Sequence, residues 1–168
     1  GNVIHTFEID TGSAMKVAFS PDGKKIAIGS TAVSLQPVAT AIKIWDIATG
    51  NNILTLKGHK DGIESIAFSP DGKILAAGTS YSDHHGRFVV TRFNSDGTLD
   101  NSFSGDGITT TDIYDDTEVI FSITRQSDGK ILAGGYTFKD GIPEYALVRY
   151  NENGDIDESF GDDGIVVI

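Results

Sequence analysis

Hydrophobic and polar residues alternate with a period of two along most of the chain, in short runs that are rich in β-branched residues. This alternation is typical of β-strands that turn one face toward a core. Apolar residues do not keep the i, i+3, i+4, i+7 spacing of an amphipathic helix for more than two turns anywhere in the sequence. The pattern therefore predicts an all-β fold.

Three segments share one pattern of strand, tight turn and strand. They cover residues 17–30, 66–79 and 123–136. An Asp-Gly pair separates the two apolar runs in each segment, which is a strong signal for a β-hairpin. The turn aspartates Asp22, Asp71 and Asp128 are 49 and 57 residues apart. Repeats of about this length are typical of β-propeller blades, so each hairpin is predicted to form part of one blade.

Each repeat contains two further predicted strands. The third strands are 41–46, 88–93 and 145–150, and the fourth strands are 53–56 and 108–113. The same outer element opens the chain at residues 3–9. We therefore predict a single propeller segment in which each repeat is one outer strand followed by three inner strands. The repeats are 1–49, 50–106 and 107–163, and a five-residue remnant covers 164–168.

Three blades are too few for a closed propeller, because closed rings typically have about four to eight. Each blade has two apolar faces, so the first and the last blade would both leave one face uncovered. We expect a homodimer or homotrimer that closes a ring of six or nine four-stranded blades. Residues 3–9 would complete the last blade of a neighbouring copy, and 164–168 could compete for the same edge. The alternative is a fragment of a longer array.

Residues 1 to about 78 resemble WD-repeat propellers. The segments that carry this resemblance are 19–23, 42–50, 58–59 and 68–72. From about residue 87 to 168 the chain is similar to the delta-60 repeat of bacterial propeller-like proteins. The segments that carry this second resemblance are 92–103, 126–134 and 149–161. Together they imply a β-propeller that is a hybrid of the two repeat types, with the changeover inside the second blade.

The sequence departs from the WD pattern at the positions that link a blade internally. WD repeats are known for a hydrogen-bond chain from a histidine through Asp and Ser or Thr to a Trp, and no blade here has all its members. The first blade has Trp45 but Asp10 in place of the histidine, and the second has His59 but Arg92 in place of the Trp. In the third blade Arg149 takes the Trp position. Because a half-satisfied buried network is costly, we expect Trp45 and His59 to find other partners. The residues assigned structural roles are Trp45, Asp46, His59, Asp22, Asp71 and Asp128.

Composition excludes several classes of protein. The formal net charge is −11, which argues against binding to nucleic acid, since that affinity comes mostly from Lys and Arg. The absence of Cys excludes a disulfide framework and a thiolate metal site, and it leaves the compartment open. Apolar runs stay well below the roughly 18 residues of a membrane span, so no membrane partner is expected.

Loops between the second and third strands vary in length and composition, as recognition loops do. Aromatic residues and Arg flank these loops and favour a contact surface. The predicted binding residues are Tyr81, His84, His85, Arg87, Tyr136 and Phe138. His84 and His85 beside Asp83 are the most metal-like cluster, but adjacent histidines at an exposed loop tip point apart, so no metal is assigned. Acidic loops at 112–116 and 151–157 do not match the twelve-residue calcium loop.

Catalytic motifs are missing from the sequence. It has no Gly-x-Ser-x-Gly, His-Glu-x-x-His or phosphate-binding glycine motif. Asp162 and Asp163 fall in a predicted surface turn, where acid-base catalysis lacks the burial that separates pKa values. No catalytic residue and no cofactor is predicted.

The leading hypothesis is a non-enzymatic scaffold that binds proteins through its loop-bearing face and assembles with itself by strand exchange. One alternative is a secreted bacterial propeller that binds carbohydrate or calcium. Another is a designed or evolutionary-model hybrid without a cellular function, motivated by the junction inside the second blade.

Overall fold

The computed structural model describes residues 5–7, 13–31, 42–57, 62–82, 85–114 and 116–168. Every regular element in these ranges is a β-strand, which confirms the all-β prediction. The strands are β1 Ser13–Phe19, β2 Lys25–Thr31, β3 Ile42–Asp46, β4 Asn52–Leu56, β5 Ile63–Phe68, β6 Ile74–Ser82, β7 His85–Phe93, β8 Ile108–Thr111, β9 Glu118–Arg125, β10 Ile131–Lys139, β11 Ile142–Tyr150 and β12 Ile165–Val167. The described residues contain no helix that could cross a membrane.

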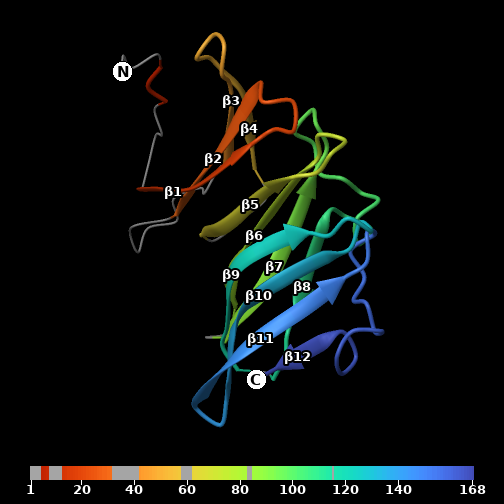
Figure 1. Cartoon of the computed structure of the whole chain (residues 1–168). Helices are drawn as coiled ribbons and strands as arrows, with labels where there is room; N and C mark the ends of the chain where they lie inside the picture. Colours follow the sequence, from red (N-terminus) through yellow and green to blue (C-terminus); the bar gives the residue numbers. More distant parts are fainter. Residues whose placement is uncertain (1–4, 8–12, 32–41, 58–61, 83–84, 115) are drawn as a thin grey trace.

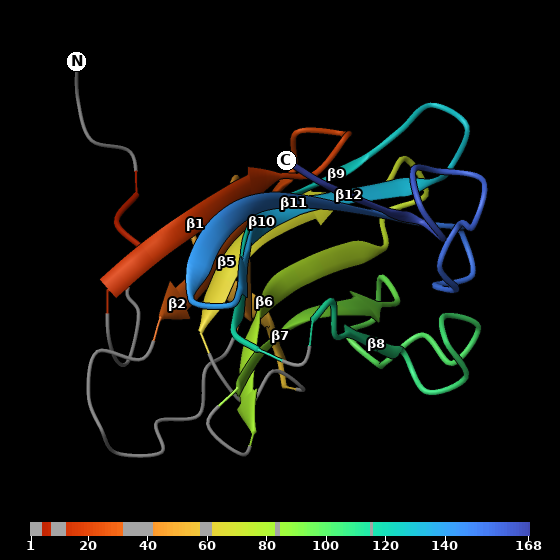
Figure 2. The same cartoon turned by 90° about the horizontal axis from the view of Figure 1, so that it is seen from below.

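The strands form three antiparallel sheets of four strands each, in the orders β1-β2-β3-β4, β5-β6-β7-β8 and β9-β10-β11-β12. We name them blades 1, 2 and 3. Blade 2 lies between the other two, and the twisted sheets follow one another like the blades of an unclosed ring (Figures 1 and 2). The predicted architecture of three four-stranded propeller blades is confirmed.

Each sheet takes its fourth strand from the start of the following sequence repeat. β4 belongs to repeat 50–106 and β8 to repeat 107–163, while β12 comes from the remnant 164–168. β12 therefore occupies the edge of blade 3 that we predicted for residues 3–9 of a neighbouring copy. Of that opening element the structure describes only residues 5–7, which form no strand and lie against blade 1 of the same chain. Strand exchange would require β12 to leave.

The hairpin registers correct the ungapped alignment of the first two repeats. β1 pairs with β2 at Phe19 and Ile26, whereas β5 pairs with β6 at Phe68 and Ile74. The first turn is thus one residue longer, and Ile26 corresponds to Ile74. Because a shift of one residue exchanges the two faces of a strand, this insertion decides which side chains point toward the next blade.

The same registers correct the position assigned to the WD tryptophan. Trp45 pairs with Ile26, and the residues in the corresponding place are Phe93 in blade 2 and Tyr150 in blade 3. Arg92 and Arg149 stand one position earlier and point to the opposite face of their sheets. They therefore cannot substitute for the tryptophan, and they take part in other contacts described below.

The hydrophobic core lies between the blades. Blades 1 and 2 share a cluster that includes Ile42, Ile44, Leu56, Ile63, Ile74 and Phe93. Blades 2 and 3 share a larger one that includes Leu75, Phe88, Val90, Phe103, Ile131, Val148 and Tyr150. Polar contacts accompany this packing: the hydroxyl groups of Thr111 and Tyr150 lie 2.7 Å apart, and the Ile120 amide donates to Thr79 Oγ1 at 3.2 Å. Apolar burial between sheets is therefore the main source of cohesion.

Substitution of Phe88 tests this arrangement, because the equivalent position in blade 3 has no neighbouring blade. Phe88 is fully buried, while Tyr145, which is 57 residues later, is 74% exposed. We expect Phe88→Ala to lower the free energy of unfolding by about 3–5 kcal/mol, as for other buried aromatic residues. Tyr145→Ala should cost less than about 1 kcal/mol, as an exposed substitution does. Urea unfolding of dilute, monomeric protein measures both, and equal losses would contradict the assignment of these faces.

Candidate functional site

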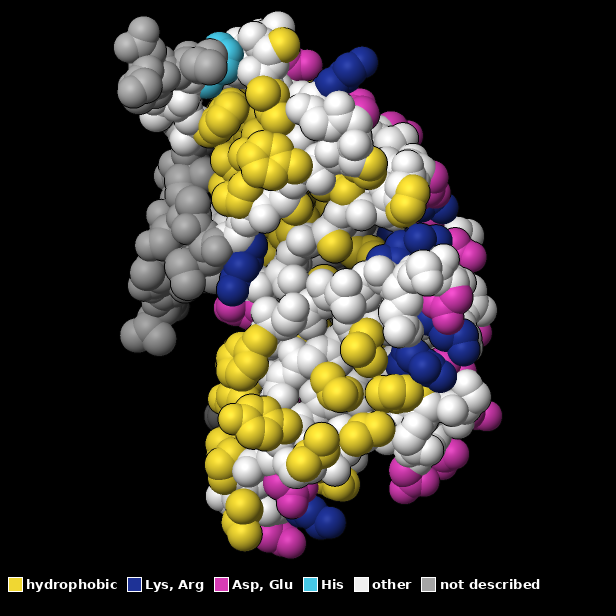
Figure 3. Space-filling view, viewed as in Figure 1, with side chains coloured by type: hydrophobic (Ala, Val, Ile, Leu, Met, Phe, Trp, Pro, Cys, Tyr) yellow, Lys and Arg dark blue, Asp and Glu magenta, His cyan; other side chains and the backbone are white. Residues whose placement is uncertain are grey.

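Blade 3 turns one apolar face away from blade 2, and we call it the open face of blade 3. Along β10 the side chains of Ile131, Ala133 and Thr137 are buried toward blade 2. The alternation of the strand places Tyr136 and Phe138 on the opposite side. A space-filling view shows hydrophobic side chains gathered over β9, β10 and β11 (Figure 3). An exposed apolar patch of this kind marks an interaction site.

Aromatic rings dominate one end of this open face. The centroid of the Tyr136 ring lies 5.4 Å from those of both Phe121 and Phe138. Phe121 is the extra residue of a β-bulge in β9, since Ser122 pairs with Gly134 and Ile120 with Gly135. A side chain on Gly135 could not be accommodated, because its Cβ would lie 1.9 Å from the Val119 carbonyl oxygen. The bulge thus turns Phe121 outward, where it is 51% exposed.

The open face of blade 3 repeats a face that is buried in blade 2. With the shift of 57 residues, Leu75, Phe88 and Val90 correspond to Leu132, Tyr145 and Leu147. The three blade 2 residues pack against blade 3, whereas their counterparts have no neighbour in the described chain. Blade 3 therefore presents a surface of the type that joins blades.

The first blade has a complementary open face on its far side, which we call the open face of blade 1. It carries Val17 and Phe19, which are exposed, and Ile26 and Ile28 beside them. Their blade 2 counterparts Ile66, Phe68, Ile74 and Ala76 belong to the core shared with blade 1. The two ends of the described chain thus resemble the two halves of one blade interface.

Trp45 lies on the open face of blade 1 and is covered by the segment 5–7. The Phe7 ring centroid is 5.5 Å from that of Trp45, and the Lys43 ammonium lies 5.8 Å from the indole. The indole N–H has no hydrogen-bond partner among the described residues. The expectation of a new polar partner for Trp45 is therefore wrong within that part of the chain, and aromatic packing replaces it. His59 lies outside the described residues.

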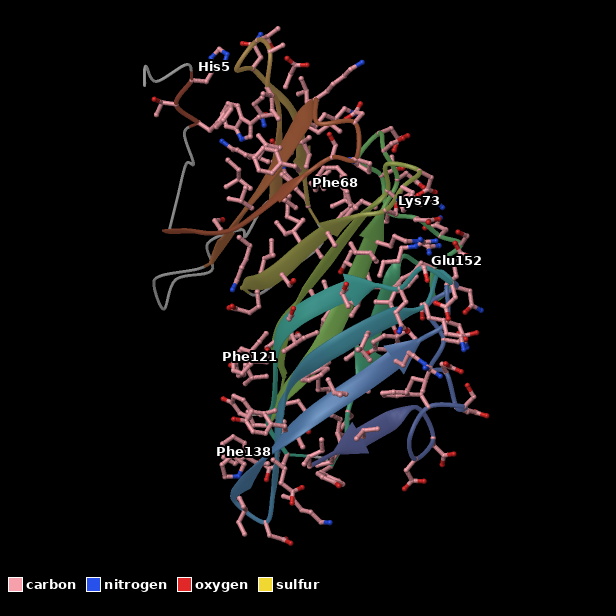
Figure 4. All side chains as sticks on the ribbon, viewed as in Figure 1. His5, Phe68, Lys73, Phe121, Phe138 and Glu152 are labelled. Carbon is pink, nitrogen blue, oxygen red and sulfur yellow. The ribbon has the colours of Figure 1, made fainter. Side chains whose placement is uncertain are left out.

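A charged cluster at the opposite end of the blades was missed by the sequence reasoning. In blade 2, Asp100 Oδ2 accepts hydrogen bonds from Arg92 Nε at 2.6 Å and from Lys73 Nζ at 2.9 Å. The Arg92 guanidinium also stacks on Phe103, with 4.7 Å between its Cζ and the ring centroid. We call these four residues the blade 2 corner. Lys73 and Glu152 mark this end of the blades in Figure 4, far from Phe121 and Phe138.

Blade 3 repeats the cluster with Arg149, Asp157, Lys130 and Phe160, which we call the blade 3 corner. Asp157 Oδ2 accepts from Lys130 Nζ at 2.7 Å and from Arg149 Nε at 2.5 Å. Arg149 Cζ lies 4.5 Å from the Phe160 centroid. The signal for both corners was the recurrence of Lys, Arg, Asp and Phe at a shift of 57 residues.

The electrostatics of the corners keep both aspartates ionised. Burial alone would raise the pKa of Asp100, but hydrogen bonds from Ser102 and Lys73 and the charge of Arg92 outweigh it and hold the pKa well below its usual range. The Lys130 hydrogen bond, with help from Ser159 and Arg149, lowers the pKa of Asp157 in the same way. The stability these ion pairs contribute is therefore present at neutral pH and is lost as the pH falls into the acid range.

The predicted binding residues fall into two separate places. Tyr136 and Phe138 belong to the open face of blade 3. Tyr81 and His85 lie at the end of the β6–β7 hairpin, where Tyr81 pairs with Gly86 and Ser82 with His85. Arg87 follows in β7 and donates from Nε to Asp112 Oδ2 at 3.0 Å. His84 lies outside the described residues, so the role of this hairpin in binding stays a prediction.

Turn aspartates occupy the positions that their structural role requires. Ser20 Oγ donates to Asp22 at 2.6 Å, and Ser69 Oγ donates to Asp71 at 2.5 Å. These serine hydrogen bonds lower the pKa of both aspartates. Asp128 accepts from the Lys130 amide at 3.1 Å, and Asp46 accepts from the Thr49 amide at 2.8 Å. Each of these contacts closes a local turn.

Metal-ligating side chains are not assembled in the part of the chain that the structure describes. No group of three or more His, Asp or Glu residues there could hold a metal ion. Asp83 and His84 lie outside that part. The acidic loop 151–157 is a turn closed by its own backbone, with the Asn151 amide donating to the Asp155 carbonyl at 2.8 Å. Asp162 and Asp163 are exposed in the turn before β12.

Two hollows mark the junctions between blades at the corner end. One, of about 280 Å³, lies between blades 1 and 2 and includes Phe68, Pro70 and Leu54. The other, of about 270 Å³, lies between blades 2 and 3 and includes Lys73, Arg92 and Arg125. The charged groups of the second hollow are already paired, since Arg125 contacts Glu152 at 3.3 Å and Arg92 and Lys73 contact Asp100. It therefore acts as a junction between blades rather than as an open anion site.

Glu118 is a buried carboxyl group at the other end of the junction between blades 2 and 3. Its Oε1 accepts from Thr137 Oγ1 at 3.1 Å, while Oε2 has no hydrogen-bond partner among the described residues. Burial raises the pKa of Glu118, and the charge of Asp112 adds to the rise, against the lowering effect of the Thr137 hydrogen bond. The protonated form is thus favoured by folding.

The raised pKa of Glu118 predicts a loss of stability with rising pH. Below the usual glutamate value of 4.5 the residue is protonated in both states, and above it the folded protein must give up a proton that it holds more tightly. Between about pH 4 and about pH 8 we expect the unfolding free energy to fall by on the order of 1 kcal/mol more than in Glu118→Gln. Glu158→Gln, an exposed control, should follow the wild-type profile. Parallel profiles for wild type and Glu118→Gln would refute the assignment.

Residues 69–103 and 126–160 match a family model described as a domain of unknown function with a β-propeller, DUF5122. These two stretches run through blades 2 and 3 and include both corners. An uncharacterised WD repeat-containing protein of Nostoc sp. strain PCC 7120 is 41% identical over 54 residues, which are 32% of this chain and 3% of that protein. The delta-60 assignment and the hybrid character stay predictions.

Among solved structures, the β-propeller domain of Cps50 (Swd1) from Myceliophteria thermophila superimposes with a TM-score of 0.54 at 20% sequence identity. The match covers 84% of this chain and 40% of that chain, so this chain spans less than half of the solved domain. Together with the three stacked four-stranded sheets, these comparisons identify the fold of the chain as three blades of a β-propeller.

Proposed function

We propose that the chain is a non-enzymatic β-propeller scaffold that binds proteins, and that one of its partners is a second or third copy of itself. The observation that carries this proposal is the open face of blade 3. It presents Leu132, Tyr145 and Leu147 to solvent at the positions where blade 2 buries Leu75, Phe88 and Val90. A face that joins blades within the chain is suited to join them between chains.

The open face of blade 1 is a suitable counterpart. Its Phe19 is 63% exposed and corresponds to Phe68, which packs into the core between blades 1 and 2. The contact between the two open faces is heterologous, and repetition of such a contact by rotation closes a ring. Two copies would form six blades and three copies would form nine.

Closure by packing of these faces does not need strand exchange. β12 already pairs with β11 through Ala146, Leu147 and Val148, so blade 3 has its four strands. We therefore propose face-to-face packing in place of the exchange of residues 3–9. The neighbouring copy then covers apolar area without breaking backbone hydrogen bonds.

A ring would leave its loop-bearing end free for other proteins. Arg87 and Asp112 form an ion pair there, and the Lys139 ammonium lies 5.1 Å from the Tyr114 ring. Aromatic and basic side chains at the end of stacked blades are the kind that interfaces favour. This second role follows from the fold by analogy, and it accords with the lack of known catalytic motifs in the sequence.

The mass of the protein in solution tests self-assembly. Light scattering after size-exclusion chromatography should give two or three times the chain mass of 17.9 kDa. Tyr145→Ser should weaken association by about tenfold or more, since it removes a large aromatic group from the centre of the contact. The control Ile53→Ser removes an exposed apolar side chain from the outer strand β4 and should leave the mass unchanged. A mass of 17.9 kDa at all accessible concentrations would rule out self-assembly.

A further inference from the structure

The blade 2 corner holds a turn of blade 3, and it does so through three contacts. Arg92 Nη1 donates to the backbone carbonyl oxygen of Glu152. The Phe103 ring lies against Gly154 so closely that a Cβ there would be 2.9 Å from it. The Ser104 amide donates to the Asn153 carbonyl oxygen at 2.7 Å. The corner thus binds a turn by its backbone carbonyls and by a glycine without a side chain.

The blade 3 corner has the same construction and holds no turn in the described chain. Arg149 is oriented by Nε on Asp157 and by Nη2 on Ser159 at 3.2 Å, and it stacks on Phe160. These contacts correspond one by one to those of Arg92 with Asp100, Ser102 and Phe103. Side chains that are already fixed in a binding geometry lose little entropy when a partner arrives. The blade 3 corner is therefore a preformed socket.

Blade 1 supplies a turn of the kind that fits this socket. In the turn after β3, Gly50 has a φ of 71°, as Gly97 and Gly154 in the later blades also have positive φ. Ala48 stands two residues before Gly50, as Glu152 stands two residues before Gly154. The carbonyl oxygen of Ala48 thus corresponds to the one that Arg92 binds in blade 3.

His5 at present occupies the blade 1 turn, and a single imidazole makes two of the corner's contacts. Its Nε2 lies 3.3 Å from the Ala48 carbonyl oxygen, to which it donates. Its ring lies against Gly50, where a Cβ would be 2.6 Å from Nδ1. His5 projects from the segment at the far end of blade 1 (Figure 4). It replaces Arg and Phe of a corner with one exposed contact.

We infer that the blade 3 corner is a binding site for the turn 46–50 of a second copy of this chain, and that His5 is a placeholder displaced on binding. This inference rests on the proposed self-assembly and adds the polar contact that orients it. Arg149 donates to the Ala48 carbonyl oxygen of the second copy, and Phe160 packs on its Gly50. A second copy is the occupant because the turn 46–50 is the described turn of this type that no preceding blade holds.

The chemistry of the socket requires arginine. Its planar guanidinium binds Asp157 and Ser159 with two nitrogens and keeps a third for a carbonyl oxygen, while its flat face stacks on Phe160. A lysine has a single ammonium group and cannot keep this arrangement. Arg149→Lys therefore preserves the charge and removes the geometry.

Two substitutions with opposite expected effects test the inference by sedimentation of the full chain over a range of concentrations. Arg149→Lys should raise the dissociation constant of self-association by about tenfold or more. His5→Ala should lower it several-fold, because a competitor for the turn is removed. Arg92→Lys, the same change in an occupied corner, should lower the melting temperature and leave the dissociation constant unchanged.

The outcomes separate this inference from the proposal on which it rests. If the chain associates and Tyr145→Ser disrupts it, while Arg149→Lys and His5→Ala both leave the dissociation constant unchanged, the socket is wrong and self-assembly stands. If neither wild type nor His5→Ala associates at any concentration, self-assembly is wrong, and the socket with it. A matching melting temperature for Arg149→Lys and wild type shows that the substitution acts on association, and His5→Ala gives an independent result if that variant does not fold.

Discussion

A sheet with two apolar faces must bury both of them, and the rest of this structure depends on that constraint. Blade 2 satisfies it, since blade 1 covers one face and blade 3 covers the other. The outer faces of blades 1 and 3 do not satisfy it within the described chain, and Phe19 and Tyr145 are exposed there. Phe7 covers only part of blade 1, over Trp45. The interaction surfaces are therefore the same faces that make the fold cohere.

Apolar packing between sheets has little directionality, and the corners supply the direction. Arg92 reaches from blade 2 to a backbone carbonyl of blade 3 while Asp100, Ser102 and Phe103 hold it in place. Such a charge-assisted contact depends on angle and distance in a way that a Leu or Val contact does not. Each corner thus sets how the next blade is oriented, and repetition of a constant orientation is what makes a ring.

The two junctions between blades use different means to the same end. Between blades 1 and 2, Leu54 and Leu56 lie against Gly97, and no arginine takes part in that contact. Between blades 2 and 3, Phe103 lies against Gly154 and Arg92 adds its hydrogen bond. In both, the positive-φ glycine of a turn lets the preceding blade approach closely. The change from leucine to an arginine corner falls between the part that resembles WD repeats and the part that matches the β-propeller family model.

The sequence by itself determined the local structure of this protein. Period-two alternation and Asp-Gly turns specify strands and hairpins because both are properties of neighbouring residues, and the repeats at 49 and 57 residues showed how many blades to expect. The extra residue near Lys25, which shifts the alignment by one, became visible only in the strand pairing. The tertiary structure alone decided that Arg92 and Arg149 build corners, that β12 completes blade 3, and that His5 lies on Gly50. Those contacts join residues far apart in the chain, and they exist only after the blades have stacked.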